Sequence, residues 1–359
     1  MNILVTGNMG YIGPSVVKQL RASYPEAVIS GLDMGYFAGC LSSPNSVLPE
    51  CLLDRQWFAD VRRMPDEALL GVDAVIHLAG ISNDPIGNAF ESVTYEINHL
   101  ATVELAKKAR AAGVRSFVYA SSCSMYGFAD DGPRMEISPL NPLTAYAKSK
   151  VYSEQRMSGL ANDEFTVTSL RFATACGMSE RLRLDLVLND FVACALTTGK
   201  ITVLSDGTPW RPLINIKDMA RAIDWAAGRG ADDGIPPYLA VNVGSDEWNY
   251  RVSELAAAVA DRIPGVEVSI NENAQPDRRS YRVNFELFRK VAPNHQPVFS
   301  LDATINELIE GLRAIDFSET DFRNSRSYIR LNTLKEMREH GLLSDGLEWM
   351  GQGAMEAVR

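Results

Sequence analysis

The chain has 359 residues, of which 46% are hydrophobic and 22% charged, close to the usage of an average globular protein. This composition excludes disorder, collagen and coiled coil, and a chain longer than about 250 residues is expected to fold as more than one unit. No apolar run reaches the ~18 residues of a membrane span, and the first residues lack the features of a signal peptide. We therefore expect a cytoplasmic protein.

The net charge of -10 repels a phosphate backbone, so nucleic acid is not an expected partner. The five cysteines are scattered without CxxC spacing, and the four histidines are equally dispersed. Neither disulfide bonds nor a metal site is expected.

Short and almost uninterrupted apolar runs occupy residues 3–5, 28–32, 74–78, 117–120 and 167–172. Such runs are typical of strands that are covered on both faces of a sheet. Long amphipathic stretches lie between them, notably at 91–112 and 145–160. This alternation predicts an α/β fold with a doubly wound parallel sheet of the Rossmann type.

A glycine-rich turn follows the first predicted strand and opens the first predicted helix, with Gly7, Gly10 and Gly13 spaced as GxxGxxG. Glycine permits a tight turn and lets the backbone approach a pyrophosphate, which the helix N-terminus favours. The spacing differs from the usual GxGxxG. A plain turn is the alternative, but the strand-turn-helix context favours a dinucleotide site.

Two aspartates follow the next strands. Asp33 ends the second strand, where its side chain can bind both adenosine ribose hydroxyls and repel a 2′-phosphate, so NAD is favoured over NADP. A capping or turn aspartate is the alternative. Asp60, followed by Val61, is a candidate to hold the adenine amino group, and an exposed turn is nearly as plausible there.

After about residue 175 the pattern breaks into shorter pieces, with turn signals at 205–209, 234–237 and 274–277. Segments of this kind often build binding surfaces. The apolar run at 238–243 predicts a return to the main sheet. We therefore divide the chain into an NAD-binding domain (1–174, completed by segments near 210–245), an interleaved, smaller substrate-binding lobe (175–317) and a polar extension (318–359) with one helix at 331–339.

The sequence resembles the extended short-chain dehydrogenase/reductase family, in its nucleotide-sugar epimerase and dehydratase branch. The matching motifs run in order through most of residues 1–315: the glycine turn, Asp33, Asp60-Val61, His77-Leu78-Ala79-Gly80, Asn98, the run 121–127 around Ser122, Tyr146-x-x-x-Lys150 and Leu170-Arg171-Phe172. The resemblance implies these cofactor-binding residues: Gly7, Gly10, Tyr11, Ile12, Gly13, Asp33, Asp60, Val61, Leu78, Ala79, Gly80, Asn98, Tyr146, Lys150 and Phe172.

Ser122, Tyr146 and Lys150 are the predicted catalytic residues. Tyr146 and Lys150 are four positions apart, so they share one face of a helix, and an ammonium nearby favours the phenolate. A carbinol would then lose its proton to Tyr146 and its hydride to NAD, with Ser122 bonding the reacting oxygen. A YxxxK pair alone is usually a solvated helix face, but the preceding serine run favours catalysis.

The neighbours of Ser122 separate the reactions of this family. Its sugar 4,6-dehydratases carry an Asp-Glu pair after the catalytic hydroxyl residue, whereas this chain has Cys123 and Ser124. Cys123 is either a proton donor or, more commonly, a small packing residue. We expect an NAD-dependent epimerase acting on a sugar carbinol, at C4. An NAD(P)H-dependent 4-ketosugar reductase is the alternative, and a dehydratase or a non-catalytic NAD-binding protein is less favoured.

The resemblance also implies residues for a nucleotide-diphosphate sugar. Arg211 offers a bidentate fork to phosphate, with a surface salt bridge as the alternative. Arg278 and Arg279 are candidate second anchors, although the neighbouring pattern departs from relatives around residues 274–275. Thr174 stands where relatives place an asparagine, and Asn189 is a substrate contact or a helix-surface residue. Ser122, Cys123 and Ser124 complete the predicted substrate contacts, and a homodimer through the two long helices is expected.

Overall fold

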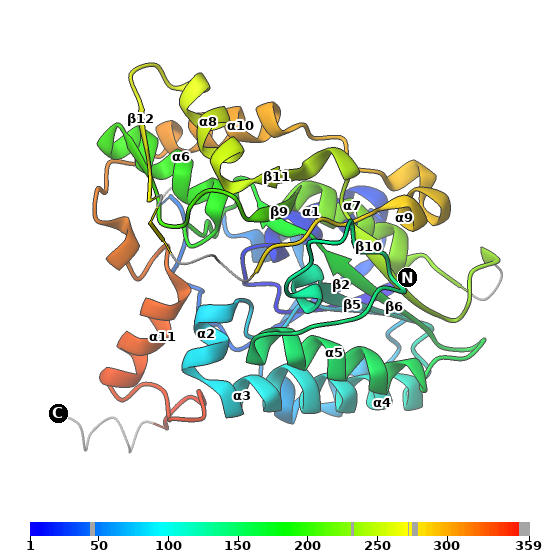
Figure 1. The fold of residues 1–359 in the computed structure, drawn as a ribbon. Helices are drawn as coiled ribbons and strands as arrows, with labels where there is room; N and C mark the ends of the chain where they lie inside the picture. The colour runs from blue at the N-terminus through cyan, green and yellow to red at the C-terminus, as the bar shows by residue number, and fades with distance from the viewer. Residues whose placement is uncertain (44–46, 231–232, 272, 275–278, 352–359) are drawn as a thin grey trace.

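A seven-stranded parallel sheet forms the centre of the computed structural model, which describes residues 1–43, 47–230, 233–271, 273–274 and 279–351 (Figure 1). Its strand order is β10-β6-β5-β4-β1-β2-β3. The strands are β1 Asn2–Thr6, β2 Val28–Asp33, β3 Arg55–Phe58, β4 Ala74–His77, β5 Ser116–Ser122, β6 Thr166–Phe172 and β10 Tyr238–Val243. The predicted doubly wound fold is confirmed.

The apolar runs form the interior of this sheet because both of their faces are covered. All seven residues of β6 are buried, as are all four of β4. The edge strand β3 is half exposed, and two of its four residues, Arg55 and Gln56, are polar, so its sequence gave no apolar run to detect. β10 pairs in parallel with β6, so the sheet is completed by a strand that lies far along the chain.

Helices cover both faces of the sheet and bury two apolar clusters against it. α1 Gly13–Ser23 and α7 Ile216–Ala227 pack on one face, and α3 Glu91–Tyr95, α4 Thr102–Ala111 and α5 Ala145–Ser158 lie on the other (Figure 1). The continuous helix predicted at 91–112 is wrong in one respect. A π-helical segment, Glu96–Ala101, interrupts it between α3 and α4.

The remaining elements form a smaller lobe above the sheet in Figure 1. Three short strands make one sheet in the order β11-β9-β7, and β8 pairs with β12. The strands are β7 Thr174–Cys176, β8 Lys200–Val203, β9 Trp210–Asn215, β11 Asn249–Arg251 and β12 Glu267–Ile270. The helices are α6 Val187–Thr198, α8 Val252–Arg262, α9 Glu286–Val291 and α10 Leu301–Ala314.

The segment after α10 returns to the main sheet. It contains α11 Arg330–Glu339, which packs against α2 Asp84–Ala89 (Figure 1). Leu334, Leu343 and Leu347 of this segment are buried and join the apolar cluster on the α3–α5 face. The extension is therefore an integral part of the folded unit, although its sequence is largely polar.

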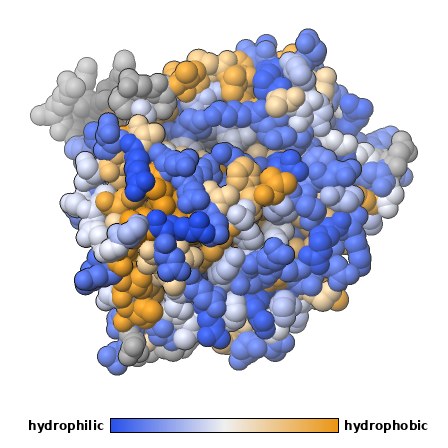
Figure 2. Space-filling model, turned by 90° about the horizontal axis from the view of Figure 1, so that it is seen from above, coloured by the Kyte–Doolittle hydropathy of each residue, from blue (hydrophilic) through white to orange (hydrophobic). Residues whose placement is uncertain are grey.

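Within the described residues, no helix is long and apolar enough to cross a membrane. Seen from above, hydrophilic side chains cover most of the surface, and hydrophobic ones gather in smaller groups, the largest toward the left edge (Figure 2).

Candidate active site

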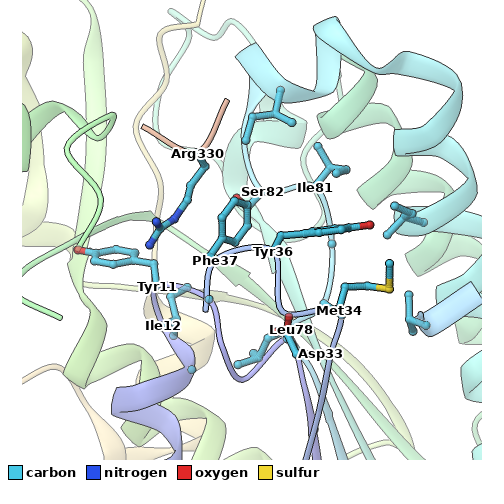
Figure 3. A pocket seen from close by; sticks show the side chains of 18 of the residues that line it. Tyr11, Ile12, Asp33, Met34, Tyr36, Phe37, Leu78, Ile81, Ser82 and Arg330 are labelled. Atoms are coloured by element: carbon cyan, nitrogen blue, oxygen red, sulfur yellow. The ribbon is translucent and has the colours of Figure 1, made fainter. Parts of the chain in front are cut away.

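A cavity lies at the carboxyl ends of β1, β2 and β4. This is the place where open α/β sheets bind ligands. Figure 3 shows side chains converging on it from the glycine turn, the β2 end, the β4 end and the C-terminal extension. Its lining includes most of the predicted cofactor-binding residues: Gly7, Gly10, Tyr11, Ile12, Gly13, Asp33, Asp60, Val61, Leu78, Ala79 and Gly80.

The glycine turn is shaped by contacts that only glycine permits. Gly7 has a φ of +74°, and a Cβ there would lie 2.5 Å from the backbone nitrogen of Ala79. A Cβ on Gly13 would lie 2.0 Å from the carbonyl oxygen of Asn8. Gly10, by contrast, faces open space apart from one carbonyl at 3.2 Å. The turn is thus packed tightly from behind and leaves its front open for a phosphate at the start of α1.

Asp33 lies in the cavity with both carboxylate oxygens anchored. Its oxygens accept hydrogen bonds from the backbone N–H groups of Gly35, at 2.8 Å, and Met9, at 3.0 Å. Burial raises the pKa of the carboxyl, and these two bonds act against that shift. Each carboxylate oxygen accepts more than one hydrogen bond, so capacity remains for the hydroxyls of a ribose.

Asp60 also lines the cavity. It caps a short 3₁₀ turn by accepting from the backbone N–H of Arg62 at 2.8 Å, and it pairs with the Arg62 guanidinium at 2.6 Å. Because its side chain is only 14% exposed, the alternative of an exposed turn aspartate is wrong. The same guanidinium donates to the carbonyl of Gly346 in the extension at 2.8 Å.

Four predicted cofactor residues lie outside the cavity lining: Asn98, Phe172 and the two helix residues Tyr146 and Lys150. Asn98, in the π-helical segment, bonds both the N–H and the carbonyl of Ile81, at 2.7 and 2.9 Å. A Cβ on Gly80 would lie 2.9 Å from Asn98 Oδ1. Asn98 therefore fixes the loop after β4 from behind the wall of the cavity. Phe172 is buried at the end of β6.

The three predicted catalytic residues meet beside this cavity. Thr144 caps α5 and sets its start, which places Tyr146 in the first turn and Lys150 one turn later. Lys150 Nζ donates to the carbonyl of Ala120 in β5 at 2.7 Å and lies 5.6 Å from the centre of the Tyr146 ring. Ser122, at the end of β5, lies close enough to Tyr146 to lower the pKa of its hydroxyl.

Burial dominates the electrostatics of this trio. It raises the pKa of Tyr146 to about 12, with Asp84 adding to the rise, while Ser122 and the charge of Arg183 lower it. Burial also lowers the pKa of Lys150 to about 7, against the attraction of Glu154. The protein alone therefore leaves Tyr146 protonated at neutral pH, and the phenolate needs further positive charge beside it.

The two residues after Ser122 offer no carboxylate. Cys123 is fully buried, and its thiol donates to the carbonyl of Arg171 at 3.1 Å. Burial raises the pKa of this thiol, so the proton-donor alternative is disfavoured and Cys123 is a packing residue. Ser124 donates its backbone N–H to Ser122 Oγ at 3.1 Å, and its own hydroxyl is buried without a hydrogen-bond partner among the described residues.

Asn189 is placed differently from both sequence interpretations. It is fully buried, so the helix-surface alternative is wrong. Its amide donates to Tyr11 Oη and to the Arg183 carbonyl, each at 2.9 Å, and accepts from the Gly177 N–H at 3.0 Å. These three bonds connect it to Tyr11 and Arg183 of the cavity lining, and its substrate contact stays a prediction. Thr174 begins β7 and is half-buried.

The two anchoring arginines come from different elements of the lobe. Arg211 lies half-buried in β9, and its charge lowers the pKa of the buried Tyr281, which Asp84 and Tyr146 raise. Arg211, Asp84 and Tyr146 are thus all close enough to Tyr281 to affect the pKa of its hydroxyl. Arg279 is exposed and pairs with Asp84 at 3.2 Å. Arg278 and Gln275 lie outside the described residues.

The sequence analysis missed Arg183 and Arg330, which also line the cavity. Arg183 is held by Asp185, and Asn83 donates to the same carboxylate at 2.8 Å. Arg330 lies four positions before Leu334, so the helix that buries Leu334 also turns Arg330 inward, but the polar sequence around them did not indicate that burial. Among the described residues, no group of histidine, cysteine and carboxylate side chains is arranged to hold a metal ion.

A Rossmann-type sheet, a glycine turn and a serine, tyrosine and lysine trio define an NAD-dependent enzyme of the extended short-chain dehydrogenase/reductase type. The model of the NAD dependent epimerase/dehydratase family matches residues 3–244, and the chain belongs to this family. Its cofactor is NAD.

Individual relatives are distant. A UDP-glucose 4-epimerase from Erwinia amylovora is 27% identical over 281 residues, which is 72% of this chain and 82% of the relative. A dTDP-glucose 4,6-dehydratase from Streptomyces griseus is 27% identical over 236 residues, or 64% and 70% of the two chains. The solved structure of an NAD-dependent NDP-hexosamine 5,6-dehydratase, TunA, superposes with a TM-score of 0.75 at 25% identity, covering 89% of this chain and 99% of that one.

Proposed function

We propose that the protein is a nucleotide-sugar epimerase that oxidises a sugar carbinol, at C4, to a transient ketone and then reduces the ketone from its opposite face. The family match and the epimerase among its relatives support this class of reaction. The residues around Ser122 support epimerisation in particular.

The trio has the parts that the oxidation needs. Bound NAD supplies the hydride acceptor and a positive charge on its nicotinamide ring. Tyr146 removes the hydroxyl proton as the C–H bond breaks, and Ser122 donates a hydrogen bond to the oxygen that becomes the ketone. Lys150, anchored on the Ala120 carbonyl, contributes a further N–H donor beside Tyr146. In the return step Tyr146 gives the proton back to the same oxygen.

The absence of a second acid and base beside Ser122 favours an epimerase over a dehydratase. Loss of water requires a group that protonates the leaving hydroxyl and a group that removes a carbon-bound proton. The Cys123 thiol is turned away from the site toward the Arg171 carbonyl, and Ser124 has no ionisable side chain. Asp84, the carboxylate whose charge raises the pKa of Tyr146, accepts a hydrogen bond from the Thr144 hydroxyl at 2.6 Å.

Arg211 is the proposed anchor for the substrate diphosphate, since it lies beside the same buried Tyr281 as the catalytic residues. Arg279 is the proposed second anchor, and it would exchange its pairing with Asp84 for a phosphate. Thr174 and Ser124 are the proposed hydroxyl contacts of the sugar.

The test follows the hydride. Protein carrying co-purified NAD is incubated with UDP-, GDP-, CDP- and dTDP-sugars, without added cofactor and in deuterated water. An epimerase interconverts two sugars, and the inverted carbon stays free of deuterium because the hydride never leaves the site. Stoichiometric NADH oxidation by a 4-ketosugar without epimer exchange would identify the reductase instead. A 4-keto-6-deoxy product with deuterium at C5 would identify a 4,6-dehydratase.

We also propose a homodimer through α3, the π-helical segment and α5. Tyr95, Leu100 and Tyr152 are 44%, 49% and 43% exposed on these elements. Large apolar side chains that are exposed together on one surface are typical of a protein–protein interface. Sedimentation of the protein should give twice the chain mass, and Tyr152→Glu should shift it toward the monomer. A wild-type protein that sediments as a monomer contradicts the dimer.

A further inference from the structure

The extension after residue 318 lies outside the family match at 3–244, yet it enters the cofactor cavity. Figure 3 shows Arg330 descending from this segment, with its guanidinium lying between Tyr11 and Phe37 in that view. Arg330 is 1% exposed, and Leu334, one turn later in α11, lines the same cavity.

Three buried arginines meet at this corner, and two of them are neutralised. Arg181 forms a bidentate pair with Glu50, at 2.8 and 3.1 Å. Arg183 forms a bidentate pair with Asp185, at 2.8 and 3.0 Å. Their charges are therefore satisfied within the protein.

Arg330 differs from both. It donates to the carbonyls of Ser327 and Arg181, at 3.1 and 2.8 Å, and its guanidinium lies 4.7 Å from the centre of the Phe37 ring. Its Nε is buried and has no hydrogen-bond partner, and no carboxylate in the described part of the chain lies within ion-pair distance of it. Burial lowers the pKa of Arg330 to about 10. The positive charges of Arg183 and Arg181 contribute to this decrease, and the negative charge of Asp185 opposes it.

A buried cation without a counterion is costly, and proteins rarely keep one without use. The cavity that it lines receives NAD, whose diphosphate is drawn to the start of α1 at Gly10, Tyr11 and Ile12. Arg330 lies across from this turn, beside Tyr11 (Figure 3). The diphosphate of NAD, bound at the glycine turn, would therefore lie where Arg330 lacks a counterion.

The rest of the extension closes over the adenosine end of the cavity. Trp349 Nε1 donates to the carbonyl of Met34 at 2.7 Å, and the hydroxyl of Tyr36 donates to the carbonyl of Leu347. Arg62, which pairs with Asp60 of the cavity wall, donates to the Gly346 carbonyl. The extension is thus bonded on two sides to the loops that follow β2 and β3.

We propose that the C-terminal extension is a cofactor-binding element of this protein, in which Arg330 binds the diphosphate of NAD and residues 343–349 hold the adenosine end closed. NAD leaves this site only when the extension moves away. A cofactor held in this manner suits a reaction that regenerates it in each cycle, although the binding role does not depend on which reaction the enzyme performs.

The test compares two variants of Arg330 by calorimetry with ADP-ribose, after removal of bound NAD. Arg330→Gln keeps an N–H donor for the two carbonyls but loses the charge, and it should weaken ADP-ribose binding by about 10- to 100-fold, the range for a charge-assisted hydrogen bond. Arg330→Lys retains the charge and should stay within a few-fold of wild type. Arg326→Met is the matched control, because Arg326 lies on the same extension, is 70% exposed and pairs with Glu336. Unchanged affinity in Arg330→Gln, or an equal loss in Arg330→Lys, would overturn the assignment.

A second measurement needs no variant. Hydrogen exchange of the unaltered protein should slow across residues 327–349 when ADP-ribose binds, because the ligand then connects the extension to the glycine turn. Exchange in this segment that ADP-ribose leaves unchanged, with slowing confined to the turn at 7–13, would contradict the proposal. Neither readout uses turnover, so a failure here is distinguishable from a failure of the epimerase assignment.

Discussion

The Lys150 ammonium is fixed to strand β5 by a hydrogen bond to the carbonyl of Ala120, which lies 2.7 Å away and two residues before Ser122. The nearest aromatic ring, that of Tyr119, has its centre 4.6 Å from Nζ. Lys150 thus connects α5 to β5, together with the hydrogen bond from the Ser121 hydroxyl to Glu154, and the helix that carries Tyr146 is held beside the strand that carries Ser122. The cost of this arrangement is a buried amine whose pKa falls to about 7.

The first prediction concerns the effect of this buried amine on the stability of the fold. The pKa of Lys150 is about 7 in the folded protein and 10.5 in the unfolded chain, so between these values the unfolded chain binds the additional proton. Burial of the charged amine therefore destabilises the fold fully below pH 7, and this destabilisation disappears as the pH rises toward 10.5. Lys150→Met removes it, so the variant should gain thermal stability relative to wild type at pH 6 and lose most of that gain at pH 9, measured by calorimetry without NAD. An equal difference at the two pH values would contradict a buried, titrating Lys150.

A second prediction concerns Tyr146. Tyr146→Phe retains the ring in its buried position and removes only the hydroxyl, so the fold and the affinity for NAD should stay close to those of wild type. Turnover of the sugar substrate should fall by ~10² or more, the scale for loss of a general acid-base group. The measurement is single-turnover oxidation followed by NADH absorbance. A variant that retains most of its activity would remove Tyr146 from the proton-transfer step.

His77 supports a third prediction, about acid stability. Its ring nitrogens lie 2.7 Å from Thr6 Oγ1 and 2.8 Å from Thr102 Oγ1, and burial lowers its pKa to about 3. Between pH 6.5 and 3 the unfolded chain binds a proton that the folded protein does not, so stability falls on acidification through this window. His77→Gln should reduce the slope of unfolding free energy against pH there by about 1.4 kcal/mol per pH unit. Urea titrations at several pH values measure the slope, and identical slopes would show that His77 does not titrate in this way.

The fourth prediction tests the role of Asp33 in choosing NAD. Asp33→Asn removes the negative charge beside the adenosine ribose, so NAD affinity should fall by about tenfold or more while NADP affinity falls less or rises. Asp66→Asn, at a carboxylate that is 82% exposed and remote from the cavity lining, is the control. Calorimetry with both dinucleotides gives the ratio. An NAD to NADP preference that stays at the wild-type value would show that another group excludes the 2′-phosphate.

Local patterns in the sequence were enough for the sheet and the glycine turn. Short and almost uninterrupted apolar runs identify β1, β2, β4, β5 and β6 because helices cover both faces of the sheet that these strands form. The glycines at 7, 10 and 13 and Asp33 are recognisable because turn geometry and strand ends depend on neighbours in the chain. Tyr146 and Lys150 are likewise one helical turn apart.

The tertiary structure alone decided which distant segments complete the cavity. Asn189 reaches Tyr11 from 178 positions away and is buried beneath it, and Arg330 bonds the Arg181 carbonyl across 149 positions. The polar sequence of the extension gave no sign that Leu334, Leu343 and Leu347 join the main core. Such contacts depend on how whole helices pack, because burial of a side chain is set by the elements that fold over it and not by its neighbours in sequence. For that reason the sequence determined the dinucleotide fold and identified the serine, tyrosine and lysine proposed for catalysis, and only the packed structure showed that the chain's last described helix reaches the cofactor cavity.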